Sequence, residues 1–413
     1  MTYSKLPSIL LLTSTYPSVN GPSNHLFVRQ QAEKVAELGH QIMIVAAYEK
    51  RIWPFSLYHI NNHVPLWSTN PYEDHPGLDV TRMHIPILPK AYFSAHYGPL
   101  LGLIVNRYLH AAKRTRKFDL IHAHVANYAG FIAQWISKAT SVPFMVTTHG
   151  ADTDIAIHKS SAHRKAIQSC FQHAQRVVCV SRRIQDAVIE QGGRRDHCPI
   201  IRNGINVDDL ECDTLWLKER FGNRTIILSV SHLLESKGLQ YNLQALRHLI
   251  DSNKDVYYVI VGEGPYENSL RKLVRDLNIE GYVSFEGPKP HKEVMRYMSG
   301  CDIYSMPSWR ESFGIVYMEA MLNGKPVIGC TTQGISDIVE HGINGILVPP
   351  HDVKAVVESI KCLIDQPNMA AEIGTKARQL VIRELTWNKS AFQLSNLYME
   401  VLEEAHRLCN TVF

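Results

Sequence analysis

The sequence lacks several features that would assign it to a special class of protein. No apolar run approaches the roughly 20 residues that a transmembrane helix needs, and the first residues do not form a secretory signal pattern. A formal net charge of +4 over 413 residues is small and does not favour a nucleic-acid ligand. Low-complexity segments and short repeats are also absent. We therefore expect a globular cytoplasmic protein that does not bind nucleic acid.

The cysteines are too dispersed to indicate a metal site or a disulfide framework. The chain has eight of them, and no two are spaced as Cys-x-x-Cys or combine with histidines in a ligand pattern. The 21 histidines are likewise scattered. We expect reduced, mostly buried thiols in a reducing compartment, with no bound metal and no other cofactor.

The length of the chain favours two domains over one. A single hydrophobic core rarely serves 413 residues, of which 45% are apolar and 20% charged. Residues 205–222 are polar and break the apolar periodicity of the chain. We place the boundary there, with one domain at 1–205 and the next at 206–390.

Strand-length apolar runs alternate with amphipathic helical segments in both halves. This alternation predicts an α/β fold built on parallel sheets with right-handed crossovers. Residues 50–95 are rich in Pro, Asn, His and Trp, and we interpret them as an irregular insertion. The expected strands are 8–14, 41–47, 119–124, 143–148 and 176–180 in the first half, and 225–231 and 256–261 in the second.

The most informative segment reads Glu311-Ser-Phe-Gly-Ile-Val-Tyr-Met-Glu319. Gly314 permits a tight turn, and the run from Ile315 to Asn323 is typical of a helix that stops at a glycine. One carboxylate therefore precedes the helix, and the other lies about one turn inside it. The free N–H groups of a helix N-terminus suit phosphate oxygens, and flanking carboxylates can accept sugar and ribose hydroxyls. The segment suits a nucleotide sugar.

A second segment supplies a cation that could bind the diphosphate of the same ligand. In Ser229-Val-Ser-His-Leu-Leu-Glu-Ser-Lys-Gly238, a strand ends at Ser231 and Lys237 stands where a helix begins. A lysine at a helix N-terminus opposes the macrodipole, which favours an anion nearby. An ammonium there would stabilise the negative charge that grows on a departing diphosphate. The alternative interpretation is a solvated lysine.

The carboxylate segment resembles the signature of the retaining glycosyltransferases of family 4. These enzymes have the GT-B fold, in which two Rossmann-like domains face a central cleft. The run from Gly334 to Pro349 and the pair Asn203-Gly204 also match the family. The resemblance covers nearly the whole chain, is strongest over 225–350 and is weakest over 50–115. The loop at Gly21 is similar to that of members from the teichuronic-acid and exopolysaccharide branch.

The resemblance implies how the reaction and the domains are divided. The first domain would hold a glycan or lipid-linked acceptor, and the second a nucleotide-sugar donor of the UDP, GDP or ADP type. The last helix, from about residue 391 to 413, would return to the first domain. The enzyme would retain the anomeric configuration without an obligatory metal, in cell-surface polysaccharide biosynthesis.

The family motifs also assign roles to individual residues. Glu311 would hold sugar hydroxyls, Lys237 the diphosphate, and His149, which ends a strand as His149-Gly-Ala-Asp152, the transferred sugar. These three are the predicted catalytic residues. Glu319 would bind the ribose. The predicted donor-binding set is Gly21, Ser231, His232, Gly262, Gly264, Phe313, Gly314, Ile315 and Glu319.

One position departs from the family pattern and keeps other functions open. The family has Gly-Arg-Leu where this chain has Ser231-His232-Leu233, and the family arginine contacts the diphosphate. A histidine is shorter and is charged only at lower pH. A non-catalytic sugar-nucleotide-binding scaffold is therefore an alternative. A nucleotide-sugar epimerase of the same fold is a second one, although the carboxylate segment favours a transferase.

A basic segment follows an apolar helical run in the first half. Residues 97–109 are mostly apolar, and 113–117 read Lys-Arg-Thr-Arg-Lys. Such a helix could lie on an anionic membrane surface at the inner face of the membrane. The alternative is a helix packed on the sheet with a solvated basic end.

Overall fold

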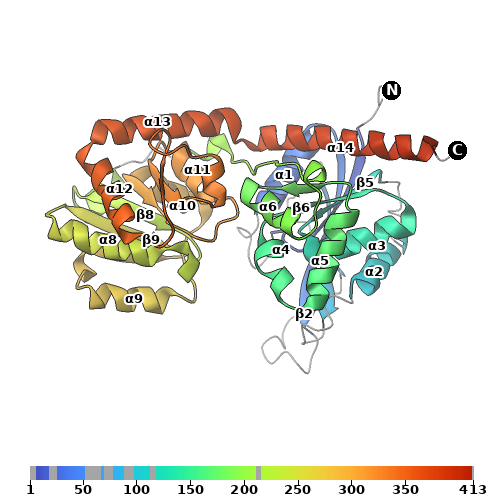
Figure 1. The fold of residues 1–413 in the computed structure, drawn as a ribbon, viewed down its shortest axis with the longest axis horizontal. Helices are drawn as coiled ribbons and strands as arrows, with labels where there is room; N and C mark the ends of the chain where they lie inside the picture. The colour runs from blue at the N-terminus through green and yellow to red at the C-terminus, as the bar shows by residue number, and fades with distance from the viewer. Residues whose placement is uncertain are drawn as a thin grey trace. The chain divides into compact units, whose positions relative to one another are not determined.

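The computed structural model describes residues 6–17, 26–51, 67–68, 78–87, 97–111, 118–210 and 215–411. These residues divide into two compact units, and Figure 1 labels their elements. Unit 1 comprises residues 1–202 and 387–413, and unit 2 comprises 203–386. The sequence had placed this division between residues 205 and 206.

Unit 1 is built on a sheet of seven strands in the order β3-β4-β2-β1-β5-β6-β7. All neighbouring strands run parallel except β3 and β4. The central strands are buried along almost their whole length, as expected where helices cover both faces. The strands are β1 (Ser8–Thr13), β2 (Gln41–Arg51), β3 (Trp67–Ser68), β4 (Leu78–Ile87), β5 (Leu120–His124), β6 (Phe144–Thr148) and β7 (Val177–Cys179).

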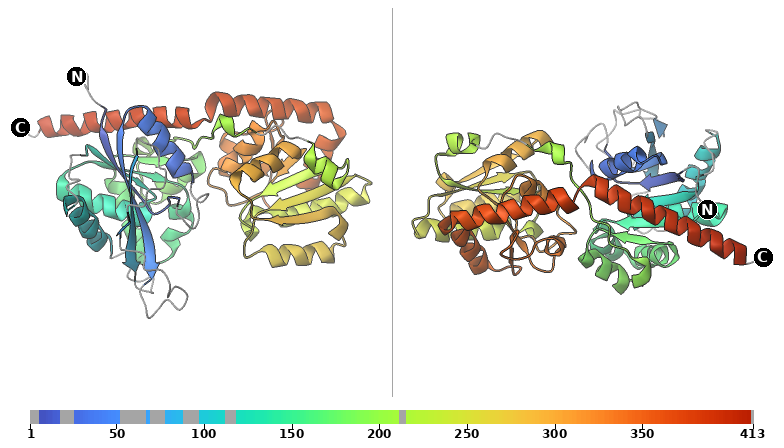
Figure 2. Two further views of the ribbon diagram at one scale, coloured as in Figure 1. Left: turned by 180° about the vertical axis from the view of Figure 1, so that it is seen from behind. Right: turned by 90° about the horizontal axis from the view of Figure 1, so that it is seen from above.

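The helices of unit 1 come from both ends of the chain. Figure 2 shows the C-terminal helix running alongside α1, and the two pack against each other. The helices are α1 (Leu26–Glu37), α2 (Tyr97–Ala111), α3 (Phe131–Thr140), α4 (Ala151–Asp154), α5 (Ser161–His173), α6 (Arg182–Glu190) and α14 (Trp387–Thr411), with a π-helical turn, η2 (Ala126–Gly130).

The C-terminal helix is part of the unit 1 core. Its Leu394, Tyr398 and Val401 are buried in one cluster with residues of β1, β2 and α1. Polar side chains tie it further: Ser390 accepts a hydrogen bond from Gln31, and Ser395 pairs with His40. The helix therefore completes a core that the N-terminal residues begin.

Unit 2 is built on a sheet of six parallel strands in the order β10-β9-β8-β11-β12-β13. The strands are β8 (Thr225–Val230), β9 (Val256–Val261), β10 (Val283–Gly287), β11 (Ile303–Ser305), β12 (Val327–Cys330) and β13 (Ile346–Val348). The helices are α7 (Trp216–Phe221), α8 (Leu239–Asp251), α9 (Glu267–Asp276), α10 (His291–Gly300), α11 (Ile315–Leu322), α12 (Val353–Asp365) and α13 (Pro367–Glu384), with a 3₁₀ turn, η6 (Glu235–Lys237), before α8.

The prediction of an irregular insertion at 50–95 is wrong for part of that range. β2 continues to Arg51, and β4 pairs with it in parallel from Ile42↔Leu78 to Arg51↔Ile87. β4 contains Asp, Thr, Arg, His and Pro, so it shows no continuous apolar run. Its Thr81 and Arg82 are buried, so the pairing with β2 and not an apolar composition places this segment in the sheet.

The two interpretations of the helix at residue 97 can be compared directly. Leu101, Val105 and Leu109 of α2 are buried, and this helix packs against α3. A Cβ at Gly102 would lie 2.6 Å from the Trp135 ring, so the two helices approach closely. This helix therefore packs within unit 1, while the basic segment 113–117 lies outside the described residues.

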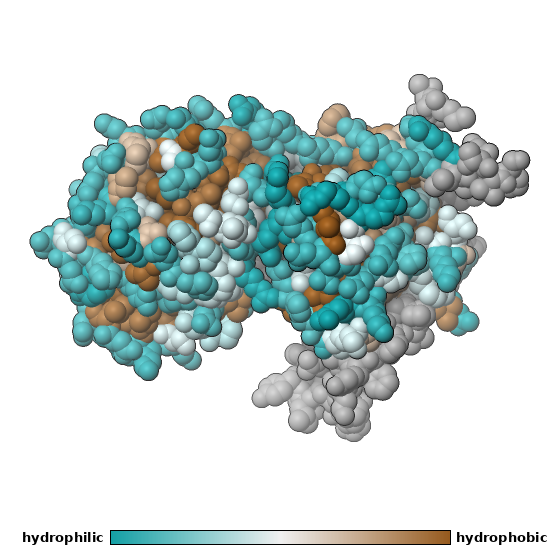
Figure 3. Space-filling model, in the orientation of Figure 1, coloured by the Kyte–Doolittle hydropathy of each residue, from teal (hydrophilic) through white to brown (hydrophobic). Residues whose placement is uncertain are grey.

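The described residues also show the character of the surface and the state of the cysteines. On the face drawn in Figure 3, hydrophilic residues cover most of the surface and hydrophobic residues form smaller patches. Among the described residues, no helix combines the length and apolar character needed to cross a bilayer. Six described cysteines are free thiols, and five of these are buried.

Candidate functional site

The strand order of unit 2 identifies where a ligand would bind. From β8 the chain moves outward to β9 and β10 on one side, and then returns to β11, β12 and β13 on the other. The direction reverses between β8 and β11, and open α/β sheets bind ligands at the carboxyl ends of such strands. The loop 231–238 follows β8 and the loop 306–314 follows β11. These two loops carry six of the twelve predicted site residues.

The structure joins two predicted residues in an ion pair. Lys237 Nζ lies 2.8 Å from Glu311 Oε2, and the side chains are 19% and 12% exposed. The residues are 74 positions apart in the chain. Sequence analysis had given them separate roles on the diphosphate and the sugar. Their contact places a partly buried ammonium and carboxylate together at the switch point of the sheet.

Backbone contacts fix Lys237 against the loop after β11. The carbonyl of Ser236 accepts hydrogen bonds from the Trp309 N–H and the Ser308 hydroxyl, both at 3.0 Å. Gly238 has a φ of +77°, and a Cβ there would lie 2.2 Å from the Pro307 carbonyl oxygen. Only glycine satisfies both requirements. The two loops are therefore held in close contact on each side of the lysine.

Glu311 is braced from its other side by the segment before β13. Its N–H donates to Gln333 Oε1 at 3.1 Å, and its carbonyl accepts from the Gly334 N–H at 3.0 Å. A Cβ at Gly334 would lie 2.1 Å from the Ser312 carbonyl oxygen. This close approach explains why the family-like run begins with glycine at this position.

The start of α11 matches the expected turn and helix. Gly314 has a φ of +89° and no side chain caps the helix. The first N–H groups of a helix lack intrahelical partners and attract anions. Ile315 begins the helix, and the N–H of Tyr317 donates back to the Gly314 carbonyl. Phe313 is only 2% exposed, so its ring belongs to the core, and donor contact through this residue stays a prediction.

Glu319 has a partner that sequence analysis missed. Its Oε1 lies 2.9 Å from His291 Nε2, and the hydrogen bond to this carboxylate raises the pKa of His291, with burial opposing the effect. Burial raises the pKa of Asp209, and the charges of His291 and Glu319 also act on this carboxyl. A histidine directly after Pro290 at the start of α10 carried no signal of this pairing in the sequence.

The glycines at 262 and 264 have a packing role that the structure explains. Gly262 has a φ of +128°, and a Cβ there would lie 1.9 Å from the Ser231 carbonyl oxygen. A Cβ at Gly264 would lie 2.4 Å from the Leu233 carbonyl oxygen. The Leu233 N–H also donates to the Glu263 carbonyl at 2.8 Å. The glycines thus let two loops lie back to back, and donor contact through them stays a prediction.

The two polar residues that follow β8 have different environments. The Ser231 hydroxyl is buried and has no hydrogen-bond partner among the described residues. His232, which stands at the position of the family arginine, is exposed. Its imidazole is therefore accessible to solvent at the edge of the sheet where Lys237 also lies.

In unit 1, His149 belongs to a row of histidines at the carboxyl ends of β5 and β6. Its Nε2 lies 3.0 Å from His124 Nδ1, and its ring packs against Phe27. Burial, with a smaller effect from His122, lowers the pKa of His124 far below its usual value. His122 in turn pairs with the Tyr398 hydroxyl of α14 at 2.8 Å. This row couples His149 to the C-terminal helix.

Asp152 is a second residue whose environment the sequence did not reveal. Its carboxyl is completely buried, and burial raises its pKa to about 6. Its Oδ1 accepts a hydrogen bond from the backbone nitrogen of Asn127 at 3.5 Å. Asn127 lies in a turn where Val125 and Tyr128 have positive φ values of 70° and 46°. Strain of this kind persists only where the surroundings enforce it. Gly21 lies outside the described residues.

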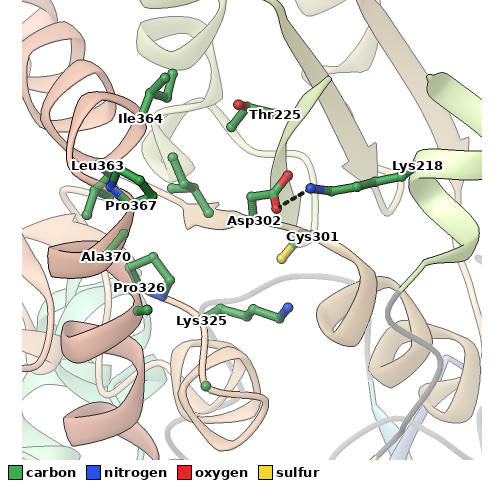
Figure 4. A pocket seen from close by; sticks show the side chains of 13 residues that line it. Lys218, Thr225, Cys301, Asp302, Lys325, Pro326, Leu363, Ile364, Pro367 and Ala370 are labelled. Carbon is green, nitrogen blue, oxygen red and sulfur yellow. Dashed lines mark ion pairs between the residues drawn. The ribbon is translucent and has the colours of Figure 1, made fainter. Parts of the chain in front are cut away.

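The structure also contains a hollow at the opposite, amino-terminal edge of the unit 2 sheet. Its volume is about 360 Å³. Among the residues that line it, Lys218 and Asp302 form an ion pair with a separation of 3.0 Å, marked by the dashed line in Figure 4. None of the predicted site residues lines it. Among the described residues, no group of three or more His, Cys, Asp or Glu side chains is placed to hold a metal ion.

Two family models match the chain and together span most of it. Residues 25–204 match a model described as a glycosyl transferase 4-like domain. Residues 217–380 match the model for glycosyl transferases group 1. The second match contains Lys237, Glu311 and Glu319, and the first contains His149.

Individual proteins agree with these models. The amylovoran biosynthesis glycosyltransferase AmsK of Erwinia amylovora is 26% identical, covering 91% of this chain and 96% of its own. TuaC of Bacillus subtilis (strain 168), named as a candidate teichuronic acid biosynthesis glycosyltransferase, is 25% identical over 95% of this chain and 98% of its own.

The fold has solved counterparts. The crystal structure of Anabaena HepE in complex with UDP has a TM-score of 0.73 at 21% identity, covering 96% of this chain and all of that one. HepE has also been solved with UDP-glucose, with a TM-score of 0.71 at 20% identity over 95% of this chain and 100% of that one. The chain belongs to the group 1, family 4 glycosyltransferases and has their two-domain α/β GT-B fold.

Proposed function

We propose that this enzyme transfers a sugar, with retention of anomeric configuration, from a nucleotide-sugar donor to a glycan or lipid-linked acceptor. Unit 2 binds the donor and unit 1 the acceptor in this proposal. The observation that carries it is the ion pair of Lys237 and Glu311 at the switch point between β8 and β11. Beside it lies the uncapped start of α11.

The chemistry of a nucleotide sugar fits this pair. Transfer breaks the bond between sugar C1 and the diphosphate, so negative charge grows on the leaving group. The Lys237 ammonium and the first N–H groups of α11 stabilise that charge. Glu311, 2.8 Å from the ammonium, accepts hydrogen bonds from sugar hydroxyls. An acceptor hydroxyl attacks C1 on the side of the departing phosphate, which retains configuration. The departing phosphate takes the hydroxyl proton, so no side-chain general base is required. The proposal includes no obligatory metal.

The pathway is proposed from the relatives. AmsK is named for amylovoran biosynthesis and TuaC for teichuronic acid biosynthesis, and HepE was crystallised with UDP and with UDP-glucose. We propose a role in cell-surface polysaccharide biosynthesis at the cytoplasmic side of the membrane. UDP and UDP-glucose are the first donor probes, followed by the GDP and ADP compounds.

A thermal-shift screen against UDP, GDP and ADP tests the proposal. A ligand present at 100 times its Kd stabilises the folded state by about 2.7 kcal/mol, so one nucleotide should raise Tm clearly. The substitution Glu319→Gln should weaken the binding of that nucleotide, measured by calorimetry, because it removes a carboxylate from the proposed ribose contact. If all three nucleotides leave Tm unchanged, the proposed donor site is wrong.

An assay with the preferred nucleotide sugar separates transfer from other outcomes. A transferase consumes donor quickly only when an acceptor extract is present, apart from slow hydrolysis. Conversion of the donor into its epimer without acceptor would contradict the proposal, as would tight donor binding with neither transfer nor hydrolysis.

A further inference from the structure

Three aromatic side chains form a cluster beside the ion pair. The Trp309 ring centroid lies 4.4 Å from that of His351 and 5.7 Å from that of Tyr241. The Tyr241 hydroxyl and His351 Nδ1 are 2.6 Å apart. The rings come from three segments, namely the first turn of α8, the loop after β11 and the turn before α12. None of the three belongs to the predicted site.

One member of this cluster is held in a strained conformation. His351 has a φ of +65°, in the left-handed region that normally favours glycine. Such a conformation is rarely populated by residues other than glycine and persists where surrounding contacts enforce it. Here the enforcing contacts are the hydrogen bond to Tyr241 and the packing on Trp309. A glycine would remove the strain but would also remove the imidazole.

The cluster is connected directly to the segments that carry the ion pair. Trp309 precedes Glu311 by two residues, and its N–H donates to the carbonyl of Ser236, the residue before Lys237. Tyr241 follows Lys237 by four residues and lies in the first turn of α8. His351 joins both to the α12 side of the unit, where Asp352 caps that helix. The rings thus brace the lysine-bearing and glutamate-bearing segments against a third element.

We propose that Tyr241, Trp309 and His351 are positioning residues that hold Lys237 and Glu311 at the separation needed for transfer. They act through the loop 307–311 and do not touch the donor. The proposal rests on the proposed donor role of the ion pair. A displacement of about 1 Å in a catalytic group can lower the rate about 10²-fold. Loosening one side of this brace should therefore lower turnover more than it lowers donor affinity.

The substitution His351→Gly separates positioning from simple packing. Glycine adopts a φ of +65° without strain, so the loss of contacts is offset and Tm should change little. The turnover number kcat should nevertheless fall by about tenfold, with the donor KM changing less than about threefold. Asn253→Gly is the matched control, because Asn253 also has a positive φ, 55°, in the turn between α8 and β9. It should leave both kcat and KM unchanged.

Two further substitutions keep the test independent of folding defects. Tyr241→Phe removes only the hydrogen bond to His351 and should lower kcat in the same direction. Trp309→Leu should lower kcat as His351→Gly does, and Trp309→Phe should restore most of it because an aromatic ring returns.

The outcomes distinguish this inference from the proposed function. An active wild-type enzyme whose kcat is unaffected by His351→Gly or Tyr241→Phe overturns the inference and leaves the proposed function intact. A fall in kcat that follows the fall in Tm from variant to variant also overturns the inference, because that result indicates packing alone. A wild-type enzyme that binds no nucleotide and transfers no sugar overturns the proposed function itself.

Discussion

At the scale of single residues, the donor side depends on charges that are paired in the folded protein. Lys237 is matched by Glu311, and Glu319 by His291, with separations of 2.8 and 2.9 Å. Each carboxylate is mostly buried, so removing its partner would leave an uncompensated charge in a poorly solvated place. The predicted roles in binding and catalysis therefore have to be tested with folding measured in parallel.

Replacing Lys237 by alanine should lower kcat by about 10²- to 10³-fold, the scale for losing one preorganised group that stabilises developing charge. Steady-state transfer kinetics with the preferred donor would measure it. The control is Lys254→Ala, which removes a lysine paired with Asp365 at the surface and should leave kcat unchanged. A Lys237→Ala enzyme with near-wild-type turnover would remove this residue from the catalytic set.

Asp152 gives a prediction on pH in unit 1. Burial raises its pKa from 3.8 to about 6 in the folded protein, so the folded state holds the proton more tightly than the unfolded chain does. The resulting stabilisation is complete below about pH 4 and is lost as the pH rises to about 6. Two units of pKa correspond to about 3 kcal/mol at most.

The substitution Asp152→Asn should abolish that dependence. Urea unfolding at pH 4.5 and pH 7 should show the variant gaining stability relative to the wild type as the pH rises. Asp276→Asn, at an exposed aspartate, is the control and should follow the wild type. A constant difference between Asp152→Asn and the wild type at both pH values would contradict a protonated, buried Asp152.

At the scale of elements, the approach of loops decides the shape of the donor side. Gly238, Gly262 and Gly334 each stand where another backbone passes too closely for a side chain. Local sequence patterns marked Gly238 beside the predicted lysine, Gly262 as a donor-binding residue and Gly334 as the start of a family-like run. They did not predict which loop would lie against which, since the partner segments come from other crossovers of the sheet.

Gly314 permits a direct measurement of this effect. It has a φ of +89°, and a Cβ there would lie 2.5 Å from the Tyr317 ring. Gly342 has a similar φ of +77° but open space around it. Both alanine substitutions should therefore incur the penalty of the left-handed conformation, about 1–2 kcal/mol.

Gly314→Ala should destabilise the protein by about 1–3 kcal/mol more than Gly342→Ala does, because the Tyr317 ring must also move. Urea denaturation of the two variants and the wild type would measure the difference. Equal destabilisation would show that the turn before α11 is not held against that ring.

At the scale of the whole molecule, residues that are distant in the sequence complete the core of unit 1. In unit 1, α14 brings Leu394, Tyr398 and Val401 against β1, β2 and α1. Its Tyr398 also bonds to His122, the first of the histidines that lead to His149. The C-terminal helix is thus part of the structure that positions His149, a predicted site residue.

Ending the chain at Thr386 should therefore destabilise unit 1 selectively. Hydrogen exchange should become fast in β1, β2 and α1, because their apolar cluster loses its cover. Exchange in the strands of unit 2 should change little, since α14 belongs to unit 1. A chain ending at His406 keeps Val401 and Leu402 and serves as the control. Unchanged protection of β1 in the shorter chain would contradict this account.

The sequence by itself determined the local features of this protein. Apolar runs predicted seven of the thirteen strands in the described residues, and the Gly314 turn predicted the start of α11. The family motifs predicted the GT-B fold and the group 1 glycosyltransferase family. These features depend on neighbouring residues or on short ordered motifs, so they can be recognised from the sequence alone. β4 was missed because its pairing with β2, and not its own composition, makes it a strand.

Only the tertiary structure decided which side chains meet. The pairs Lys237–Glu311 and His291–Glu319 and the cluster of Tyr241, Trp309 and His351 join residues between 28 and 110 positions apart. Their contacts follow from the order of strands in the unit 2 sheet and from the crossovers between them. A pattern of period two or 3.6 carries no information about that order, because it reports only which face of an element is buried.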